Sequence, residues 1–350
     1  MKKTFITLSL CLTGCASASG GDVASLAGKD VFSVQASFEA PIVSSRGDSA
    51  DDPAIYIGKD GQGFVAGTDK QAGLYIYNLD GSIRKFHPLG TLNNVDLRDG
   101  FRMGGRDYVL LVASNDELNN ITVLLYDIER DVFVIPSDNT IDIPISPYGI
   151  CLGRTVNGTF HAGITTKKGV YQQYRISEQG GQFSATKVRE FSTGTKTEGC
   201  VFDDRTGSLY IAEEEGGLYR YASAPSGKDE QLVIARPGQY GLEADFEGVS
   251  IYEQGRDGGY LLVSSQGNSS YGVFHLPDYK FSGRFEVVDG VVDGTSITDG
   301  IAVSSVSSAK FPEGFLVVQD DQDDQTKDIN AKRQNFKFID WRVISAHLED

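Results

Sequence analysis

The chain consists mostly of short apolar runs that alternate with polar residues, glycine and aspartate, and almost no segment has the 3.6-residue spacing of an amphipathic helix. Runs such as Phe64-Val65-Ala66 and Leu209-Tyr210-Ile211 are bounded by Gly, Asp or Asn on both sides. Short apolar runs with such boundaries are typical of β-strands joined by tight turns. The sequence therefore predicts an all-β protein.

One motif recurs along the chain, in which a polar residue, usually followed by glycine, opens a short apolar strand. Its six polar positions are Asp52, Asn94, Tyr148, Glu198, Glu247 and Asp299. They are spaced by roughly 50 residues, which is the length of a four-stranded propeller blade. Six such units predict a six-bladed β-propeller, and we expect residues 29–350 to form it as one domain.

A second strand follows in each unit, and a polar residue stands where that strand ends. These outer positions are Lys70, Asp116, Lys167, Glu214, Gln266 and Asp320. In an antiparallel blade the second strand ends beside the start of the first, so both sets of polar residues should meet at one end of the molecule. Any single acid could be an ordinary turn residue, but the coincidence across units predicts a functional face.

Clustered carboxylates at one mouth would repel one another unless cations sat among them. Oxygen ligands, with only 4 His and 4 Cys in the chain, favour calcium over zinc or copper. Lys70 and Lys167 on the rim of such a face suit an anionic ligand such as phosphate. Motifs for covalent phosphatases and for serine hydrolases are missing from the sequence, which favours water activated by metal, with carboxylates as ligands and base.

The formal net charge of −16 argues against nucleic acid or an anionic membrane surface as a partner. Lys2 and Lys3, a short apolar stretch and Leu12-Thr13-Gly14-Cys15 resemble a lipoprotein signal over residues 1–14. We expect a lipid on Cys15, a flexible leader over 15–28, and export to the periplasm, the outer membrane or the medium. An ordinary secretory signal cut near Ala16 to Ala18 is the alternative. We expect a monomer.

Cys151 and Cys200 are the cysteines of the expected folded domain. Their settings match, because each lies beside a glycine at the start of an expected inner strand. Export would permit a disulfide between adjacent strands. Two separate buried thiols explain the same pattern equally well.

Several motifs, in this order, resemble the β-propeller phytases, which are calcium-dependent phytate hydrolases. They are Asp51-Asp52-Pro53-Ala54-Ile55, Leu92-Asn93-Asn94-Val95-Asp96, Thr197-Glu198-Gly199, Leu209-Tyr210-Ile211-Ala212-Glu213-Glu214, Asp245-Phe246-Glu247-Gly248, Ser264-Ser265-Gln266-Gly267-Asn268, Asp293-Gly294-Thr295-Ser296-Ile297-Thr298-Asp299-Gly300 and Asn335-Phe336-Lys337.

The resemblance implies several bound Ca²⁺ ions and direct attack of metal-activated water on a phosphate of myo-inositol hexakisphosphate. It implies a structural calcium held by Asp52, Asp293 and the carbonyls of Pro53 and Val95. It places a catalytic calcium cluster at Asp51, Glu198, Glu214, Asp245, Glu247, Gln266 and Asp299. It makes Lys70, Tyr148 and Lys167 ligands of substrate phosphate.

One position departs from this pattern, because the family often has Arg where this chain has Asp116. An acid there should weaken phosphate binding, unless Arg98 or Arg102 reaches in as a substitute. The alternatives to a phytase are a calcium-dependent propeller hydrolase of a lactone or a small phosphate ester, and a propeller that binds calcium and an anion without catalysis.

Overall fold

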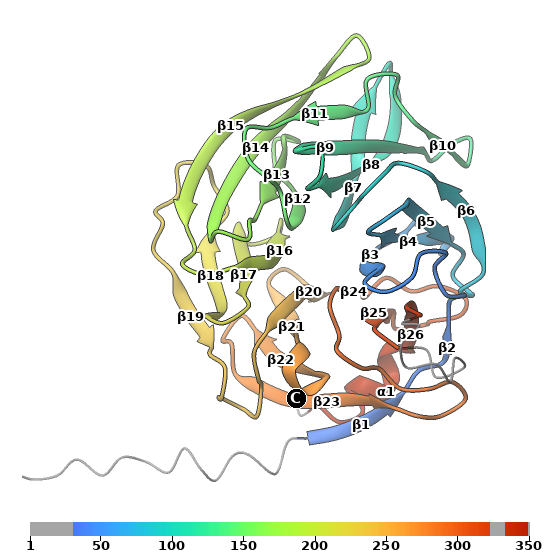
Figure 1. Cartoon of the computed structure of the whole chain (residues 1–350), viewed down its shortest axis with the longest axis vertical. Helices are drawn as coiled ribbons and strands as arrows, with labels where there is room; N and C mark the ends of the chain where they lie inside the picture. Colours follow the sequence, from blue (N-terminus) through green and yellow to red (C-terminus); the bar gives the residue numbers. More distant parts are fainter. Residues whose placement is uncertain (1–30, 323–332, 349–350) are drawn as a thin grey trace, which may run out of the picture.

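The structure, a computed structural model, describes residues 31–322 and 333–348. These residues form six sheets that surround a central axis, and the strand pairs within them are antiparallel except for one edge pair, which confirms the predicted six-bladed β-propeller (Figure 1). The predicted signal peptide (1–14), leader (15–28) and Cys15 lie outside the described residues.

The strands of each blade are given in order from the innermost to the outermost. Blade 1 contains β3 (Ala50–Ile57), β4 (Gly63–Asp69), β5 (Gly73–Tyr77) and β6 (Ile83–His87). Blade 2 contains β7 (Val95–Met103), β8 (Arg106–Asn115), β9 (Asn120–Asp127) and β10 (Val132–Val134), and β11 (Thr140–Asp142) also pairs with β9. Blade 3 contains β12 (Ile150–Arg154), β13 (Phe160–Ile164), β14 (Val170–Gln179) and β15 (Gln182–Ser192).

The second half of the ring repeats this arrangement. Blade 4 contains β16 (Thr197–Asp203), β17 (Ser208–Glu213), β18 (Gly217–Ala222) and β19 (Leu232–Ala235). Blade 5 contains β20 (Phe246–Gln254), β21 (Gly258–Ser265), β22 (Ser270–Leu276) and β23 (Phe281–Val288). Blade 6 contains β24 (Ile301–Ser304), β25 (Phe315–Asp320) and β26 (Asn335–Asp340).

The segment ahead of blade 1 closes the ring. β1 (Val31–Gln35) adds a parallel outer strand to β23 of blade 5, and β2 (Phe38–Glu39) pairs antiparallel with β26 of blade 6. Figure 1 shows both strands lying against the last two blades. The two ends of the propeller domain are therefore joined by backbone hydrogen bonds within one chain.

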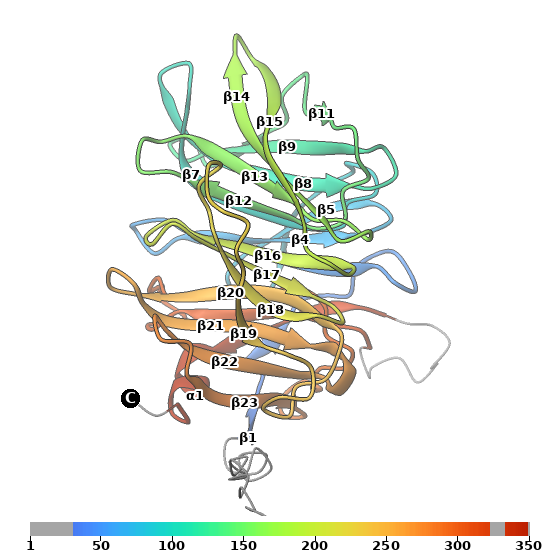
Figure 2. The ribbon, with the colours of Figure 1, turned by 90° about the vertical axis from the view of Figure 1, so that its left-hand side faces the viewer.

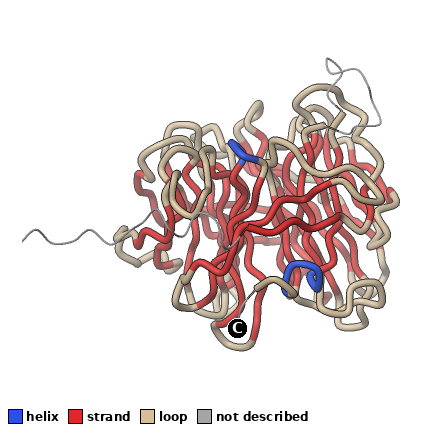
Figure 3. Tube along the Cα trace, turned by 90° about the horizontal axis from the view of Figure 1, so that it is seen from below, coloured by secondary structure: helices blue, strands red, loops and turns tan. Residues whose placement is uncertain are grey.

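Strands dominate the described chain, with loops at both ends of the blades (Figures 2 and 3). The short helix α1 (Trp341–Ser345) follows the last strand, and the 3-10 turn η2 (Gln266–Asn268) follows β21. The indole of Trp341 stacks on the ring of Tyr252, with the ring centroids 3.9 Å apart. This contact joins the end of blade 6 to blade 5.

The hydrophobic core lies between neighbouring blades. Phe64 and Ala66 of β4, for example, pack in one cluster with Val109 and Leu111 of β8. Because the middle strands are covered on both faces, their sequences are continuously apolar instead of alternating. This packing explains the short apolar runs seen in the sequence.

The glycine of the recurring motif is required by the close approach of the inner strands. A Cβ on Gly199 would lie 2.0 Å from the carbonyl oxygen of Glu247, and one on Gly149 would lie 1.9 Å from that of Glu198. Real side chains do not tolerate such contacts, so only glycine fits. The polar residue before each glycine is thereby fixed close to the propeller axis.

Cys151 of β12 and Cys200 of β16 form a disulfide, with their Cα atoms 5.6 Å apart. Of the two interpretations left open by the sequence, the structure has the bridge. It links the inner strands of blades 3 and 4.

Candidate active site

Irregularities in strand pairing aim the acidic side chains of the motif. The register of the inner strand against the second strand shifts between Ala50 and Pro53, between Thr197 and Cys200, and between Phe246 and Val249. The residues inside these shifts are Asp51, Asp52, Glu198, Gly199, Glu247 and Gly248. A bulge breaks the alternation of a strand and can redirect a side chain, as is common next to active sites.

Buried hydroxyl groups at the ends of the second strands, Thr165 directly after β13 and Ser264 within β21, hold these irregular segments in place. The Thr165 hydroxyl accepts a hydrogen bond from the Gly149 amide at 3.1 Å and donates to the Glu198 carbonyl at 2.7 Å. Ser264 links the Gly248 amide to the Asp299 carbonyl in the same way. Each hydroxyl therefore ties the start of one inner strand to the next blade. The sequence analysis missed these positions, although Thr or Ser recurs at the same place in the second strand.

Three of the predicted acids meet at the mouth of the propeller. One carboxylate oxygen from each of Glu198, Glu214 and Glu247 lies within 4.8 Å of the others, and all three residues are buried. The Oε2 atom of Glu247 accepts no hydrogen bond within the described chain. We call Glu198, Glu214 and Glu247 the glutamate cluster. Its unpartnered buried oxygen and its three hard ligands fit a divalent cation.

The electrostatics of the glutamate cluster also favour a cation. Burial raises the pKa of Glu214 to about 7, a value that includes an opposing effect of the Lys196 ammonium and a smaller upward effect of the Glu198 charge. Burial, followed by the charges of Glu198 and Glu214, raises the pKa of Glu247 well above its ordinary value. Carboxylates with raised pKa values gain when a bound cation neutralises them.

A second group of predicted residues adjoins the cluster. The ammonium of Lys70 lies 3.0 Å from Asp51 Oδ1 and 3.9 Å from Asp299 Oδ2. Gln266 donates a hydrogen bond to the other oxygen of Asp299. Burial raises the pKa of Asp299 to about 7. The charge of Lys70 opposes this rise, and the charge of Glu198 adds to it. The structure thus brings Asp51, Asp299, Gln266 and Lys70 to the same mouth as the glutamates.

Tyr148 and Lys167 also lie at this mouth, close enough to the glutamate cluster for its charges to act on Tyr148. The Lys167 ammonium lies 4.6 Å from the centre of the Tyr148 ring. Burial, followed by the charges of Glu198 and Glu247, raises the pKa of the Tyr148 phenol, so the hydroxyl stays protonated. Lys196, which the sequence analysis did not single out, lies 5.0 Å from the same ring centre and 2.8 Å from Glu214 Oε1.

Neither arginine considered as a substitute at Asp116 lies near it. Arg98 forms ion pairs with Asp96 and Asp204, each with a closest distance of 3.0 Å. Arg102 pairs with Asp107 where β7 and β8 are joined, at the far end of β8 from Asp116. The cation next to Asp116 is Lys167, whose ammonium is 3.3 Å from Asp116 Oδ2.

In the structure, Asp52 and Asp293, which were expected to hold a structural calcium, contact groups of the protein itself. The Val95 amide donates to Asp52 Oδ2 at 3.1 Å, which places the start of β7 beside the Asp52-Pro53 segment. Asp293 contacts the buried ammonium of Lys337, as does Glu39.

Asp245, expected in the catalytic cluster, directly precedes β20. Its carbonyl accepts a hydrogen bond from the Gln266 amide. It contributes to the raised pKa of Glu214.

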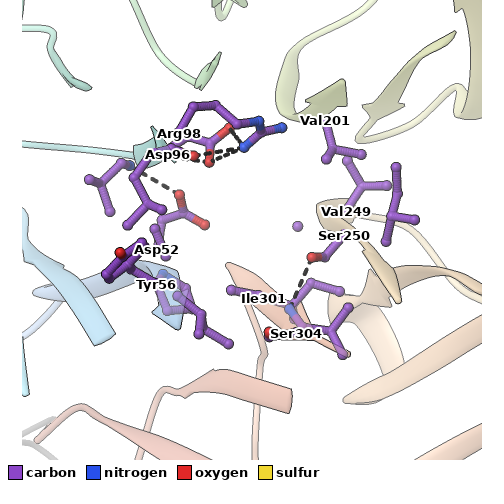
Figure 4. Close-up of a pocket in the computed structure, with 18 of the residues that line it drawn as sticks. Asp52, Tyr56, Asp96, Arg98, Val201, Val249, Ser250, Ile301 and Ser304 are labelled. Carbon is purple, nitrogen blue, oxygen red and sulfur yellow. Dashed lines mark hydrogen bonds and ion pairs between the residues drawn. The ribbon is translucent and has the colours of Figure 1, made fainter. Parts of the chain in front are cut away.

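A cavity of about 280 Å³ lies between the inner strands (Figure 4). Val201, Val249 and Ile301 give it apolar walls, Asp52 lies on one side, and the Arg98–Asp96 pair lies on another. None of the three members of the glutamate cluster lines it. The cavity and the acidic mouth are therefore separate features.

Known proteins resemble this chain along almost its full length. The family model described as Phytase matches residues 2–350. The chain belongs to the phytase family. It is 38% identical over 330 residues to the 3-phytase of Bacillus subtilis (strain 168), and the match covers 91% of this chain and 86% of that protein. The expected family and enzyme class are thus confirmed.

Two solved structures show weaker likeness. A chain of the hydrazine synthase from Kuenenia stuttgartiensis has a TM-score of 0.49 at 14% identity, covering 76% of this phytase family member and 79% of that chain. A chain of the Mitotic Checkpoint Complex has a TM-score of 0.45 at 9% identity, covering 90% and 82%. Neither likeness carries a functional argument.

Proposed function

We propose that this enzyme hydrolyses phytate to lower inositol phosphates and phosphate, and that calcium ions at the glutamate cluster are required. The observation that carries the proposal is the convergence of Glu198, Glu214 and Glu247 within 4.8 Å, in a buried setting where Glu247 Oε2 has neither a hydrogen bond nor an ion pair within the described residues. Asp51, Asp245, Gln266 and Asp299 lie around them and offer further oxygen ligands. Ca²⁺ accepts about 6 to 8 such oxygens in flexible geometry.

Bound there, calcium would offset the charge of the substrate and lower the pKa of a water molecule, so that water can attack phosphorus. The chain supplies the remaining contacts. Lys70 and Lys167 provide positive charge at the rim for phosphate oxygens. Tyr148, whose raised pKa keeps its phenol protonated, can donate a hydrogen bond to phosphate. Position 116 is Asp116 and not arginine, so Lys70 and Lys167 supply the positive charge that binds phosphate.

The test is phosphate release from phytate, measured with calcium and with a calcium chelator. We expect turnover with calcium, none with the chelator, and recovery when calcium is restored. Chelator-resistant turnover would contradict the metal requirement. Absence of turnover under both conditions would favour a propeller that only binds, and hydrolysis of a lactone or a small phosphate ester in place of phytate would favour the other alternative.

We propose further that the protein is exported, carries a lipid on Cys15 and acts as a monomer. The Cys151–Cys200 disulfide supports an oxidising compartment. The closure of all six blades within one chain supports a monomer. Within residues 31–322 and 333–348, no helix has the length and apolar character needed to cross a membrane. Mass spectrometry of the mature N-terminus and sedimentation would test these points.

A further inference from the structure

Lys196 stands at a junction between the glutamate cluster and the phosphate-binding rim. It directly precedes β16, two residues before Glu198. Its ammonium lies 2.8 Å from Glu214 Oε1, and 5.0 Å from the centre of the Tyr148 ring. Its side chain keeps 41% of its accessible surface, whereas that of Glu214 keeps 4%. The lysine is therefore the solvent-exposed partner of this ion pair, and the carboxylate is the buried one.

The ring of Tyr148 is flanked by a second ammonium, that of Lys167 at 4.6 Å. Two ammonium groups against one ring are close enough to contact a single small polyanion. Lys167, however, is paired with Asp116 at 3.3 Å, which offsets part of its charge. A phosphate bound at this rim would therefore gain from another cation.

The contact between Lys196 and Glu214 should weaken when a divalent cation occupies the glutamate cluster. A metal bound to the Glu214 carboxylate would repel an ammonium that lies 2.8 Å from Oε1 of the same group. The displaced ammonium is already 5.0 Å from the centre of the Tyr148 ring, beside which the substrate phosphate is expected, and a phosphate there would attract it.

We propose that Lys196 is a phosphate-binding residue that metal occupancy releases from Glu214, so that it supplies a second ammonium beside Tyr148 and Lys167. This inference rests on the proposed function, because it takes the glutamate cluster as the metal site. In the metal-free protein Lys196 pairs with one member of the glutamate cluster, Glu214. In the metal-loaded protein it compensates for the acid at position 116.

The proposal predicts effects of opposite sign on two ligands. In Lys196→Met, calcium should bind the metal-free protein about 2- to 5-fold more tightly, because an exposed ion pair no longer competes for Glu214. Binding of myo-inositol hexasulfate to the calcium-saturated protein should weaken about tenfold or more, because a charged hydrogen bond is lost. The KM for phytate should rise similarly, with kcat little changed. Lys196→Arg should restore most of the hexasulfate affinity.

Lys168→Met is the matched control. Lys168 is exposed on the same rim, and in the described chain its side chain has no hydrogen bond or ion pair. Titration calorimetry with calcium alone, and then with hexasulfate, gives both affinities for each variant. Equal weakening of hexasulfate binding in the two methionine variants would overturn the proposal, because only the general field would have changed. Weaker calcium binding in Lys196→Met would overturn it as well.

Phosphate release by the wild type and hexasulfate affinity of the variants together separate this proposal from the proposed function on which it rests. If the wild type releases no phosphate from phytate with calcium, the proposed function fails, whatever Lys196 does. If the wild type turns over phytate and Lys196→Met keeps its hexasulfate affinity, only the role of Lys196 fails. Thermal melting in chelator would establish that each variant is folded.

Discussion

The ammonium of Lys337 lies 3.4 Å from Asp320 Oδ2, and neither side chain has any solvent-accessible surface. Glu39 of β2 and Asp293 also contact this ammonium. One buried cation therefore holds together the closing strand β2, the two strands β25 and β26, and the loop before β24. The charge that joins blade 6 to the N-terminal segment is supplied by the chain itself.

Replacing Lys337 with methionine should destabilise the protein strongly. The substitution would leave several carboxylates without their shared cation, and breaking a buried pair in this way costs about 3 to 5 kcal/mol of unfolding free energy. Denaturant unfolding would measure the loss. Lys59→Met, at an exposed lysine of the β3–β4 turn, should change the unfolding free energy by less than about 0.5 kcal/mol. Equal stability of the two variants would contradict the assigned role of Lys337.

The disulfide between Cys151 and Cys200 should contribute measurably to stability. It closes a segment with a sequence separation of 49 residues, so restricting the unfolded chain should add about 2 to 4 kcal/mol. The double variant Cys151→Ala/Cys200→Ala should lose that amount in denaturant unfolding. The wild type in strong reductant should unfold like the double variant, and an unchanged midpoint in both would refute the bridge.

Removing the hydroxyl of Thr165 should lower activity, although this residue is not among those expected to contact substrate. Thr165→Val leaves the Gly149 amide and the Glu198 carbonyl without their shared partner, and Glu198 then loses its fixed position. A fall in kcat/KM of about tenfold is expected for loss of such a supporting contact. Thr165→Ser retains the hydroxyl and should stay close to the wild type. If both variants behave alike, the hydroxyl does not position Glu198.

Metal-free stability should depend on pH through Glu214. Its pKa in the folded protein is about 7, above its ordinary value of 4.5, so the folded state holds the extra proton between these values. The free energy of unfolding therefore falls as pH rises through this window. Glu214→Gln cannot ionise and should be more stable than the wild type at pH about 8.5 in chelator, by on the order of 1 kcal/mol, yet similar at pH about 4.

In saturating calcium the wild type should be more stable than Glu214→Gln. Calcium stabilises the folded protein that binds it, and the variant lacks the Glu214 carboxylate. Burial also raises the pKa values of Asp299 and Asp320 to about 7, but both residues are present in the wild type and in Glu214→Gln, so the comparison isolates the contribution that depends on Glu214. Glu215→Gln, at an exposed neighbour, is the control. Melting temperatures at the two pH values, with chelator and with calcium, provide the check. A pH-independent difference in chelator would contradict the raised pKa of Glu214.

Much of the site could be predicted because it follows from the repeat. Glu198 and Glu247 occupy the same place in successive blades, and the glycine after each is required by the neighbouring backbone. The start of each inner strand therefore indicated which side chains would meet. The closure of the ring by β1 and β2 could not be found in this way, because pairing between distant segments leaves no local pattern.

The roles of individual cations were harder to predict. Arg98 stands four residues after Asn94, and its place on the inner strand does not reveal that Asp96 and Asp204 bind it. Lys196 lies before β16 and belongs to neither set of repeated polar positions, so only the fold brings it to Glu214. The repeat spacing predicted which acidic residues lie at the mouth. The partners of the long basic side chains could be identified only from the structure.

The most direct test of the account is the position of calcium in a crystal grown with calcium and myo-inositol hexasulfate, located by anomalous scattering. We expect a calcium peak bonded at about 2.3 to 2.6 Å to carboxylate oxygens of Glu198, Glu214 and Glu247, with a sulfate group between it and the rim lysines. Calcium bound only elsewhere, with the three glutamates free of metal, would contradict the claim that they form the catalytic metal site.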